Sequence, residues 1–181
     1  MGKNIACCVL IFCSFHLMAQ KRFGTNQGRI DFISKADLEL IRASSNKLQG
    51  LVNPVNNQFA FTVDVQTFQG FNSDLQKEHF NEKYMESELY PKMSFSGKII
   101  EAVDFTMDGI FEVRAKGELD IHGQKQTRII KSTITIDSGT MTIESIFKVP
   151  LADHNIAIPR LVNQKIATEI EITVKAPMTL Q

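Results

Sequence analysis

Hydrophobic and polar residues alternate along most of the chain. In the clearest run, GIFEVRAKGELDIH at 109–122, apolar or small side chains occupy every second position from Phe111 to Ile121, and charged side chains fill the positions between them. Successive side chains of a strand point to opposite faces of a sheet, and a helix would not separate residues in this way. The run therefore predicts a strand with one buried face and one solvated face.

The same alternation predicts strands elsewhere. The clear runs lie at 59–65, 93–99, 141–149 and 166–174, and weaker ones at 29–34, 38–43, 47–52 and 128–136. Turn-forming residues separate the runs at 53–57, 107–109, 122–124 and 137–139. We expect eight or nine consecutive antiparallel strands. Such a meander hides its edges by closing into a barrel, although spacing alone does not distinguish a barrel from a two-sheet sandwich.

One segment, SDLQKEHFNEKYM at 73–85, carries helical signals instead. Ser73 and Gln76 have the spacing of a capping box, and Asp74 is favourable in a first helical turn. Pro91 requires an extended chain at the residue before it. The apolar residues of the segment do not form a clean amphipathic stripe, so we expect one short helix that lies against the barrel.

The residues expected on the inner face mix large and small side chains. The large ones are Phe61, Phe95, Phe111 and Phe147, and the small ones are Gly97, Ala115, Gly117, Ser132 and Ser145. Small residues leave open volume unless neighbouring side chains reach across it. The inner face of the clearest strands carries no charge, so such a space would be apolar and would suit a hydrocarbon chain, whose burial is worth about 0.8 kcal/mol per methylene. The pattern leaves open whether the barrel is hollow or filled.

Residues 1–19 have the features of a secretory signal peptide. Lys3 precedes an apolar run at 5–15 that is too short to span a bilayer as a helix, and HLMAQ offers a cleavage site after Ala19. We expect residues 20–181 to form a single exported domain. A lipoprotein anchor is the weaker alternative, because Phe12 precedes Cys13 where a small residue is expected. All the cysteines lie in this segment, so the mature chain would contain no disulfide: Cys7, Cys8 and Cys13.

The charge balance argues against a nucleic-acid partner. The chain has 20 Lys and Arg against 20 Asp and Glu, and no basic cluster. No second apolar run is long enough for a stable membrane span.

Four stretches resemble the YceI-like family, exported bacterial lipocalin-like barrels that bind polyisoprenoid or related lipids: 28–50, 74–99, 115–130 and 147–176. The most specific is AKGELDIHGQKQTRII at 115–130, which is similar to the family's Gly-acid-Leu-x-Ile-His-Gly turn. Two features depart from the family pattern. Asp120 stands where the family usually has Thr, and the next strand reads QKQTR instead of a Val-Thr-Lys-Pro type of sequence.

The resemblance implies an all-β, antiparallel lipocalin-like barrel of roughly eight strands with one short helix. It also implies an internal tunnel, no established catalytic machinery and no cofactor, with an isoprenoid or other long-chain lipid as the partner. The implied role is that of a lipid carrier or sequestering protein in the periplasm. The sequence is compatible with a homodimer. On this basis we expect the ligand to contact inner-face and mouth residues: Phe32, Phe61, Phe80, Tyr84, Met85, Phe95, Phe111, Val113, Ile134, Phe147 and Ile170.

Candidate metal or acid–base residues cluster in the helical segment. Glu78, Glu82 and Glu86 follow at four-residue spacing and would share a helix face from which His79 is turned away. No second set of ligands follows them, so we expect a solvated helix face and no metal site. Phe80, Tyr84 and Met85 would then form a lid over the barrel mouth or, in the alternative interpretation, close the bottom of the barrel as core.

The other histidines carry weaker signals. His122 and Gly123 predict a hairpin turn in which the histidine hydrogen-bonds locally, and His154 falls in a polar turn. No nucleophile elbow, phosphate loop or dinucleotide fingerprint occurs, so we expect no catalytic residues and no enzyme activity. Two alternatives stay open: a small enzyme of lipid or quinone metabolism that uses His79 or His122, and a filled barrel that serves as an interaction module.

Overall fold

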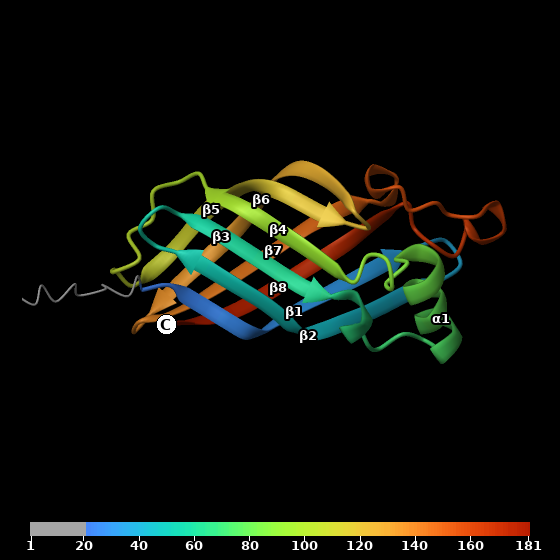
Figure 1. The fold of residues 1–181 in the computed structure, drawn as a ribbon, viewed down its shortest axis with the longest axis horizontal. Coiled ribbons are helices and arrows are strands. Elements are labelled where there is room, and N and C mark those ends of the chain that lie inside the picture. Colours follow the sequence, from blue (N-terminus) through green and yellow to red (C-terminus); the bar gives the residue numbers. More distant parts are fainter. Residues whose placement is uncertain (1–20) are drawn as a thin grey trace, which may run out of the picture.

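The computed structural model describes residues 21–181, so the predicted signal peptide, its cleavage site and the three cysteines lie outside the described residues. Eight antiparallel strands form a closed barrel in which each strand pairs with its neighbours in sequence and β8 pairs with β1 (Figure 1). The strands are β1 (Phe23–Lys35), β2 (Leu40–Asn53), β3 (Gln58–Asp64), β4 (Lys92–Ile99), β5 (Gly109–Ile121), β6 (Gln124–Asp137), β7 (Thr140–Pro150) and β8 (Glu169–Leu180).

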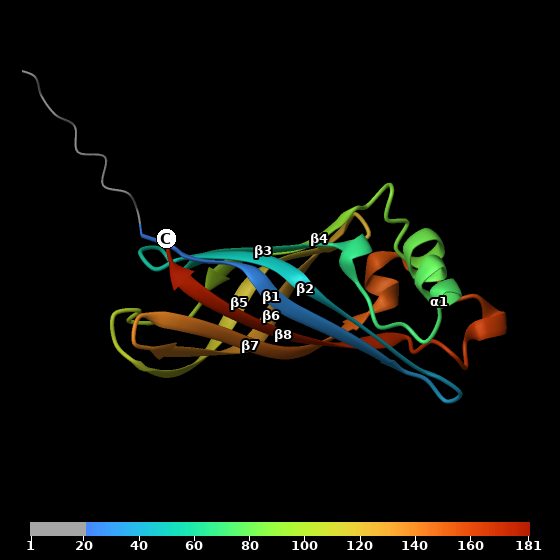
Figure 2. The ribbon, with the colours of Figure 1, turned by 90° about the horizontal axis from the view of Figure 1, so that it is seen from below.

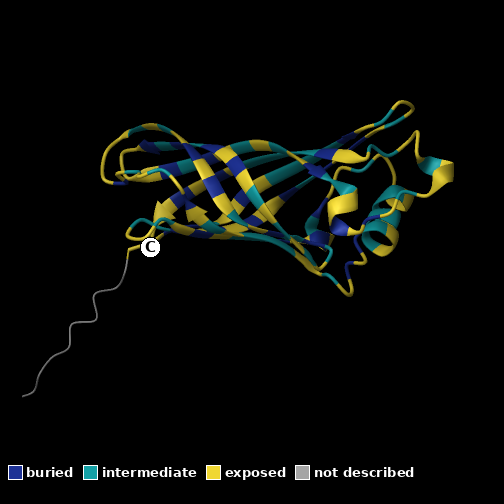
Figure 3. Cartoon of the chain, turned by 90° about the horizontal axis from the view of Figure 1, so that it is seen from above, coloured by how far each residue is buried: buried dark blue, intermediate teal, exposed yellow. Residues whose placement is uncertain are grey.

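The closed barrel confirms the predicted fold class and resolves the choice between barrel and sandwich. Phe32 of β1 lies opposite Ile172 of β8, so the ladder continues around the full circle and leaves no free edge. Buried and exposed positions alternate along the strands, as the sequence pattern predicts (Figure 3).

Two details of the predicted strands are wrong. Strand β2 begins at Leu40, within the first run, and continues through the run at 47–52, because one of the polar residues between the two runs is accommodated inside the barrel. Ser45 is buried there, and its hydroxyl lies 2.7 Å from the Thr67 hydroxyl. Ile166 also precedes β8, which begins at Glu169.

Two tight hairpins have the backbone geometry that their turn residues favour. His122 and Gly123 connect β5 to β6 with φ angles of 54° and 67°, and Ser138 and Gly139 connect β6 to β7 with φ angles of 50° and 78°. Positive φ at both central residues matches the right-handed twist of the flanking strands.

Two long connections lie at the same end of the barrel, which we call the mouth end, and the described chain termini lie at the other end (Figure 2). The first, between β3 and β4, contains η1 (Val65–Thr67), α1 (Asp74–His79) and the π-helical turn η2 (Phe80–Tyr84). The second, between β7 and β8, contains η3 (Leu151–His154) and η4 (Arg160–Val162). No helix within residues 21–181 has the length and apolar character needed to cross a membrane.

The predicted cap of the short helix is present in a modified form. The Ser73 hydroxyl accepts a hydrogen bond from the backbone N–H of Gln76 at 3.2 Å. The Gln76 side chain accepts from the N–H of Asn72 at 3.0 Å, one residue earlier than in a capping box.

Candidate functional site

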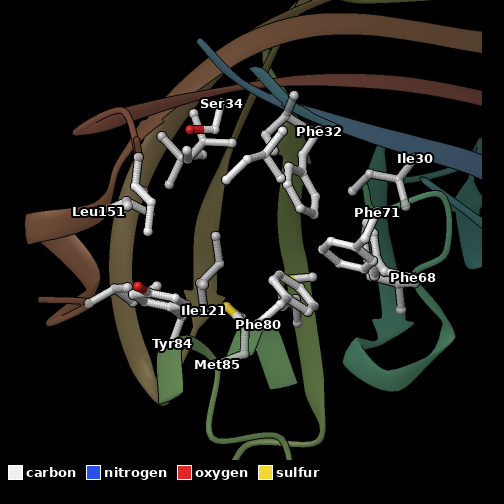
Figure 4. A pocket seen from close by; sticks show the side chains of 18 of the residues that line it. Ile30, Phe32, Ser34, Phe68, Phe71, Phe80, Tyr84, Met85, Ile121 and Leu151 are labelled. Carbon is white, nitrogen blue, oxygen red and sulfur yellow. The ribbon is translucent and has the colours of Figure 1, made fainter. Parts of the chain in front are cut away.

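The barrel contains a cavity of about 460 Å³ at its mouth end. This volume lies within the range of small-molecule binding sites. Side chains from the strands and from both mouth connections surround an open centre (Figure 4), and most of them are apolar. The sequence left open whether the barrel was hollow, and the structure shows that its mouth half is.

The cavity brings together eight of the eleven residues predicted to contact a ligand. They are Phe32, Phe61, Phe80, Tyr84, Met85, Phe95, Phe147 and Ile170. Phe111, Val113 and Ile134 do not border it, and Val113 and Ile134 line only a separate void of about 20 Å³. Strand alternation indicates which side chains face inward, but it does not indicate their height along the barrel axis.

The small inward residues were expected to leave open volume, but none of them borders the cavity. Ala115 and Ser132 border only the small void. The neighbouring strand covers both glycines closely: a Cβ atom added to Gly97 would collide with the main chain at Lys116, and one added to Gly117 would collide with the main chain at Ser96 and lie 3.0 Å from Cε2 of Phe95. These positions therefore permit close packing and leave no open volume.

Four phenylalanines join the connection between β3 and β4, residues 65–91, which we call the mouth segment, to the barrel wall. We call them the aromatic cluster: Phe32, Phe68, Phe71 and Phe80. The rings of Phe32 and Phe80 are stacked with centroids 5.4 Å apart, and the Phe71 ring lies 5.1 Å from Phe80. The sequence analysis missed Phe68 and Phe71 because they lie in the irregular chain before α1, where no periodicity identifies inward positions.

The π-helical turn explains why the helical segment lacks an amphipathic stripe. The N–H of Met85 donates to the carbonyl oxygen of Phe80 at 2.9 Å, five residues earlier. This wider turn brings residues five apart onto one side of the segment. Phe80, Tyr84 and Met85 can therefore all border the cavity (Figure 4), which places the segment over the mouth.

Polar side chains gather at the mouth, and several are already engaged. The Gln76 amide donates to the Glu39 carboxylate at 2.9 Å, and Nε2 of His79 lies 3.0 Å from Nζ of Lys83. Lys165 borders the cavity and has no ion-pair partner within residues 21–181. Burial raises the pKa of the Tyr84 hydroxyl, so this group is a neutral phenol at physiological pH. Lys165 and Tyr84 are thus the groups most available to a ligand head group.

Deeper in the cavity, two hydroxyl groups of the wall are paired within the protein, those of Ser34 and Thr62. The Ser34 hydroxyl accepts from the N–H of Ala167 at 2.9 Å, and the Thr62 hydroxyl donates to the carbonyl oxygen of Met93 at 3.2 Å. Pairing removes their demand for a ligand partner, so the interior suits a hydrocarbon.

His122 and His154 make contacts that their sequence context did not suggest. His122 does not bond locally: its Nδ1 lies 3.1 Å from the carbonyl oxygen of His154, and its Nε2 lies 2.7 Å from a carboxylate oxygen of Glu86. His154 is fully buried, with Nδ1 3.0 Å from the carbonyl oxygen of Gln124. The two histidine rings therefore connect the β5–β6 hairpin to both of the long connections at the mouth end.

The glutamates of the mouth segment do not share one helix face. Glu86 follows the end of η2 and has a positive φ of 42°, because the chain turns there. In the part of the chain that the structure describes, no three His, Cys, Asp or Glu side chains are placed to hold a metal ion.

Comparisons with known proteins agree with this architecture. The sequence profile of the YceI-like domain matches residues 15–178. Among proteins of curated function, none matches the chain significantly.

Solved structures with the same fold are similar over most of the chain. A polyisoprenoid binding domain from Saccharophagus degradans, implicated in plant cell wall breakdown, has a TM-score of 0.75 at 13% identity, covering 90% of this chain and 99% of that one. BcnA from Burkholderia cenocepacia has a TM-score of 0.69 at 17% identity, covering 83% and 95%. The YceI protein of Campylobacter jejuni has a TM-score of 0.55 at 13% identity, covering 98% and 97%. At these identities the likeness shows the fold.

Proposed function

Because the chain belongs to the YceI-like domain family and its barrel encloses an apolar cavity with a polar mouth, we propose that it binds the apolar chain of a lipid inside the barrel. The ligand class is a polyisoprenoid or fatty-acyl lipid. The protein serves as a carrier or sequestering protein in the periplasm, which it reaches by means of the cleaved segment 1–19, and it catalyses no reaction.

The observation that carries this proposal is the apolar cavity of about 460 Å³. A preformed apolar space gains free energy when a hydrocarbon chain leaves water and enters it, at about 0.8 kcal/mol per methylene. The Saccharophagus degradans relative, which is a polyisoprenoid binding domain, supports the ligand class.

The polar mouth supports one orientation of the ligand. The hydrocarbon lies against the phenyl rings and branched side chains of the wall, and the head group stays at the mouth near Tyr84 and Lys165. A non-catalytic role is consistent with the histidines. Of the three within residues 21–181, only His79 borders the cavity, and the His122 ring is held by Glu86 and the His154 carbonyl.

Filling the cavity tests the proposal. Ile172 lies on β8 between Phe32 and Phe147 and faces the cavity. The Ile172→Trp variant places a larger ring in the space that the lipid needs, so we expect its affinity to fall about tenfold or more, a cost of at least about 1.4 kcal/mol. Displacement of a fluorescent fatty acid measures the affinity.

The matched control is Ile146→Trp on the neighbouring strand β7. The Ile146 side chain is 69% exposed on the outer face of the barrel, so the same substitution there leaves the cavity unchanged. We expect wild-type affinity for this variant. Equal binding by wild type and both variants would place the lipid outside the cavity.

A further inference from the structure

The interior of the barrel is divided into two unequal spaces. The large cavity occupies the mouth half. A separate void of about 20 Å³ lies among inward residues that include Phe59, Val113 and Ser132. A void of this size has room for about one water molecule, so it is far too small for a hydrocarbon chain. Only the mouth half can therefore accept a hydrocarbon chain.

A wall of phenyl rings from β3 and β4 separates the two spaces. Phe95 lines the cavity and Phe59 lines the void, and their ring centroids are only 4.9 Å apart. Phe61, opposite Phe95 in the strand register, also lines the cavity, and its ring lies 6.2 Å from Phe59. One side of this wall thus faces the large cavity, and the other side faces the small void.

Glycines on the adjoining strands allow the rings to lie across the interior. Gly50 is paired with Phe61, and a Cβ atom there would collide with the Phe61 ring. Gly97 is paired with both Phe59 and Gly117, so no side chain competes with the rings at these two positions. The absence of side chains at these positions therefore leaves room for the rings of the wall.

The barrel is filled behind the wall. Phe23 and Phe105 pack there with centroids 6.0 Å apart, and Met141 and Met178 are each about 1% exposed. Side chains this deeply buried fill that half of the barrel, so a ligand that enters at the mouth meets a closed end.

We propose that Phe59, Phe61 and Phe95 set the maximum length of hydrocarbon that the barrel encloses. If each methylene takes roughly the 30 Å³ that a water molecule occupies in the liquid, the cavity of about 460 Å³ holds on the order of 15 methylenes. The favoured ligand is therefore a lipid with one chain of about 15 to 20 carbons. This inference rests on the proposed lipid-binding function and adds the determinant of chain length.

A series of saturated fatty acids of about 10 to 24 carbons, competed in pairs and read by native mass spectrometry, tests the proposal. In wild type, each added methylene strengthens binding roughly fourfold until the chain reaches the wall. Beyond about 18 carbons the gain falls below about twofold per methylene, because the added carbons stay at the mouth in contact with water.

The Phe95→Ala variant removes one ring of the wall and enlarges the enclosed space. The plateau should therefore move to chains longer by roughly four carbons. Phe95→Leu, a milder change, shifts it in the same direction and serves if the alanine variant does not fold. Phe111→Ala is the matched control: Phe111 packs against the core but does not border the cavity, so its plateau stays in place.

Affinity that keeps rising through the longest chain in wild type would overturn the wall as a length limit. A plateau that Phe95→Ala leaves unmoved, or that Phe111→Ala moves equally, would do the same. Absence of binding at every chain length is a distinct result, which overturns the lipid-binding function together with this inference.

Discussion

Tyr84 shows how a single side chain suits the boundary between an apolar cavity and its polar mouth. Its ring borders the cavity, and burial raises the pKa of its hydroxyl because the charged phenolate is poorly solvated there. The neutral phenol can donate a hydrogen bond to a head group while its ring contacts hydrocarbon. The same residue is thus suited to both parts of the amphipathic ligand that we propose.

We expect Tyr84 to ionise only above the ordinary tyrosine pKa of about 10. Because the folded protein binds this proton more tightly than the unfolded chain does, the contribution of the neutral phenol to stability is complete below about pH 10 and is lost as the pH rises further. The ultraviolet absorbance of phenolate during an alkaline titration measures the ionisation of Tyr84. Tyr84→Phe should remove the step that belongs to the buried phenol. A Tyr84 step at the ordinary pKa would contradict the assigned burial.

At the scale of elements, the segment formed by α1 and η2 lies over the mouth of the cavity. It contributes Phe80 to the aromatic cluster, and Glu86 beyond its end meets His122 of the β5–β6 hairpin. Neither contact is local in sequence. The segment is therefore held by the barrel and not by its own helical propensity, as expected for so short a helix.

Phe80→Ala should loosen this segment. Phe/Trp→Ala changes in cores typically cost about 3–5 kcal/mol, and we expect about 3 kcal/mol or less here because the ring borders open space. Hydrogen exchange of residues 74–87 should accelerate, and lipid release should be faster. Phe111→Ala, at the packed end, should lower stability without affecting exchange in this segment. Equal acceleration in both variants would indicate general destabilisation and contradict the local role.

The whole molecule divides into a packed half and an open half, and the sequence predicts the two unequally well. Alternation predicted most strands, and the His122–Gly123 turn was correct, because these features depend on neighbours in sequence. The position of the cavity was not predictable, since inward parity leaves the height of Phe111 or Phe95 along the axis unspecified. The pattern did not identify Phe68 and Phe71 as inward residues, because their contacts arise only when the irregular connection folds over the mouth.

Native mass spectrometry of the recombinant protein, as purified and after incubation with prenyl and fatty-acyl lipids, is the most direct test that the hollow half holds a lipid. We expect a complex with one lipid molecule per chain, which collisional activation dissociates into protein and free lipid. A protein that carries no lipid after purification, and takes up neither class when it is supplied, would contradict the account.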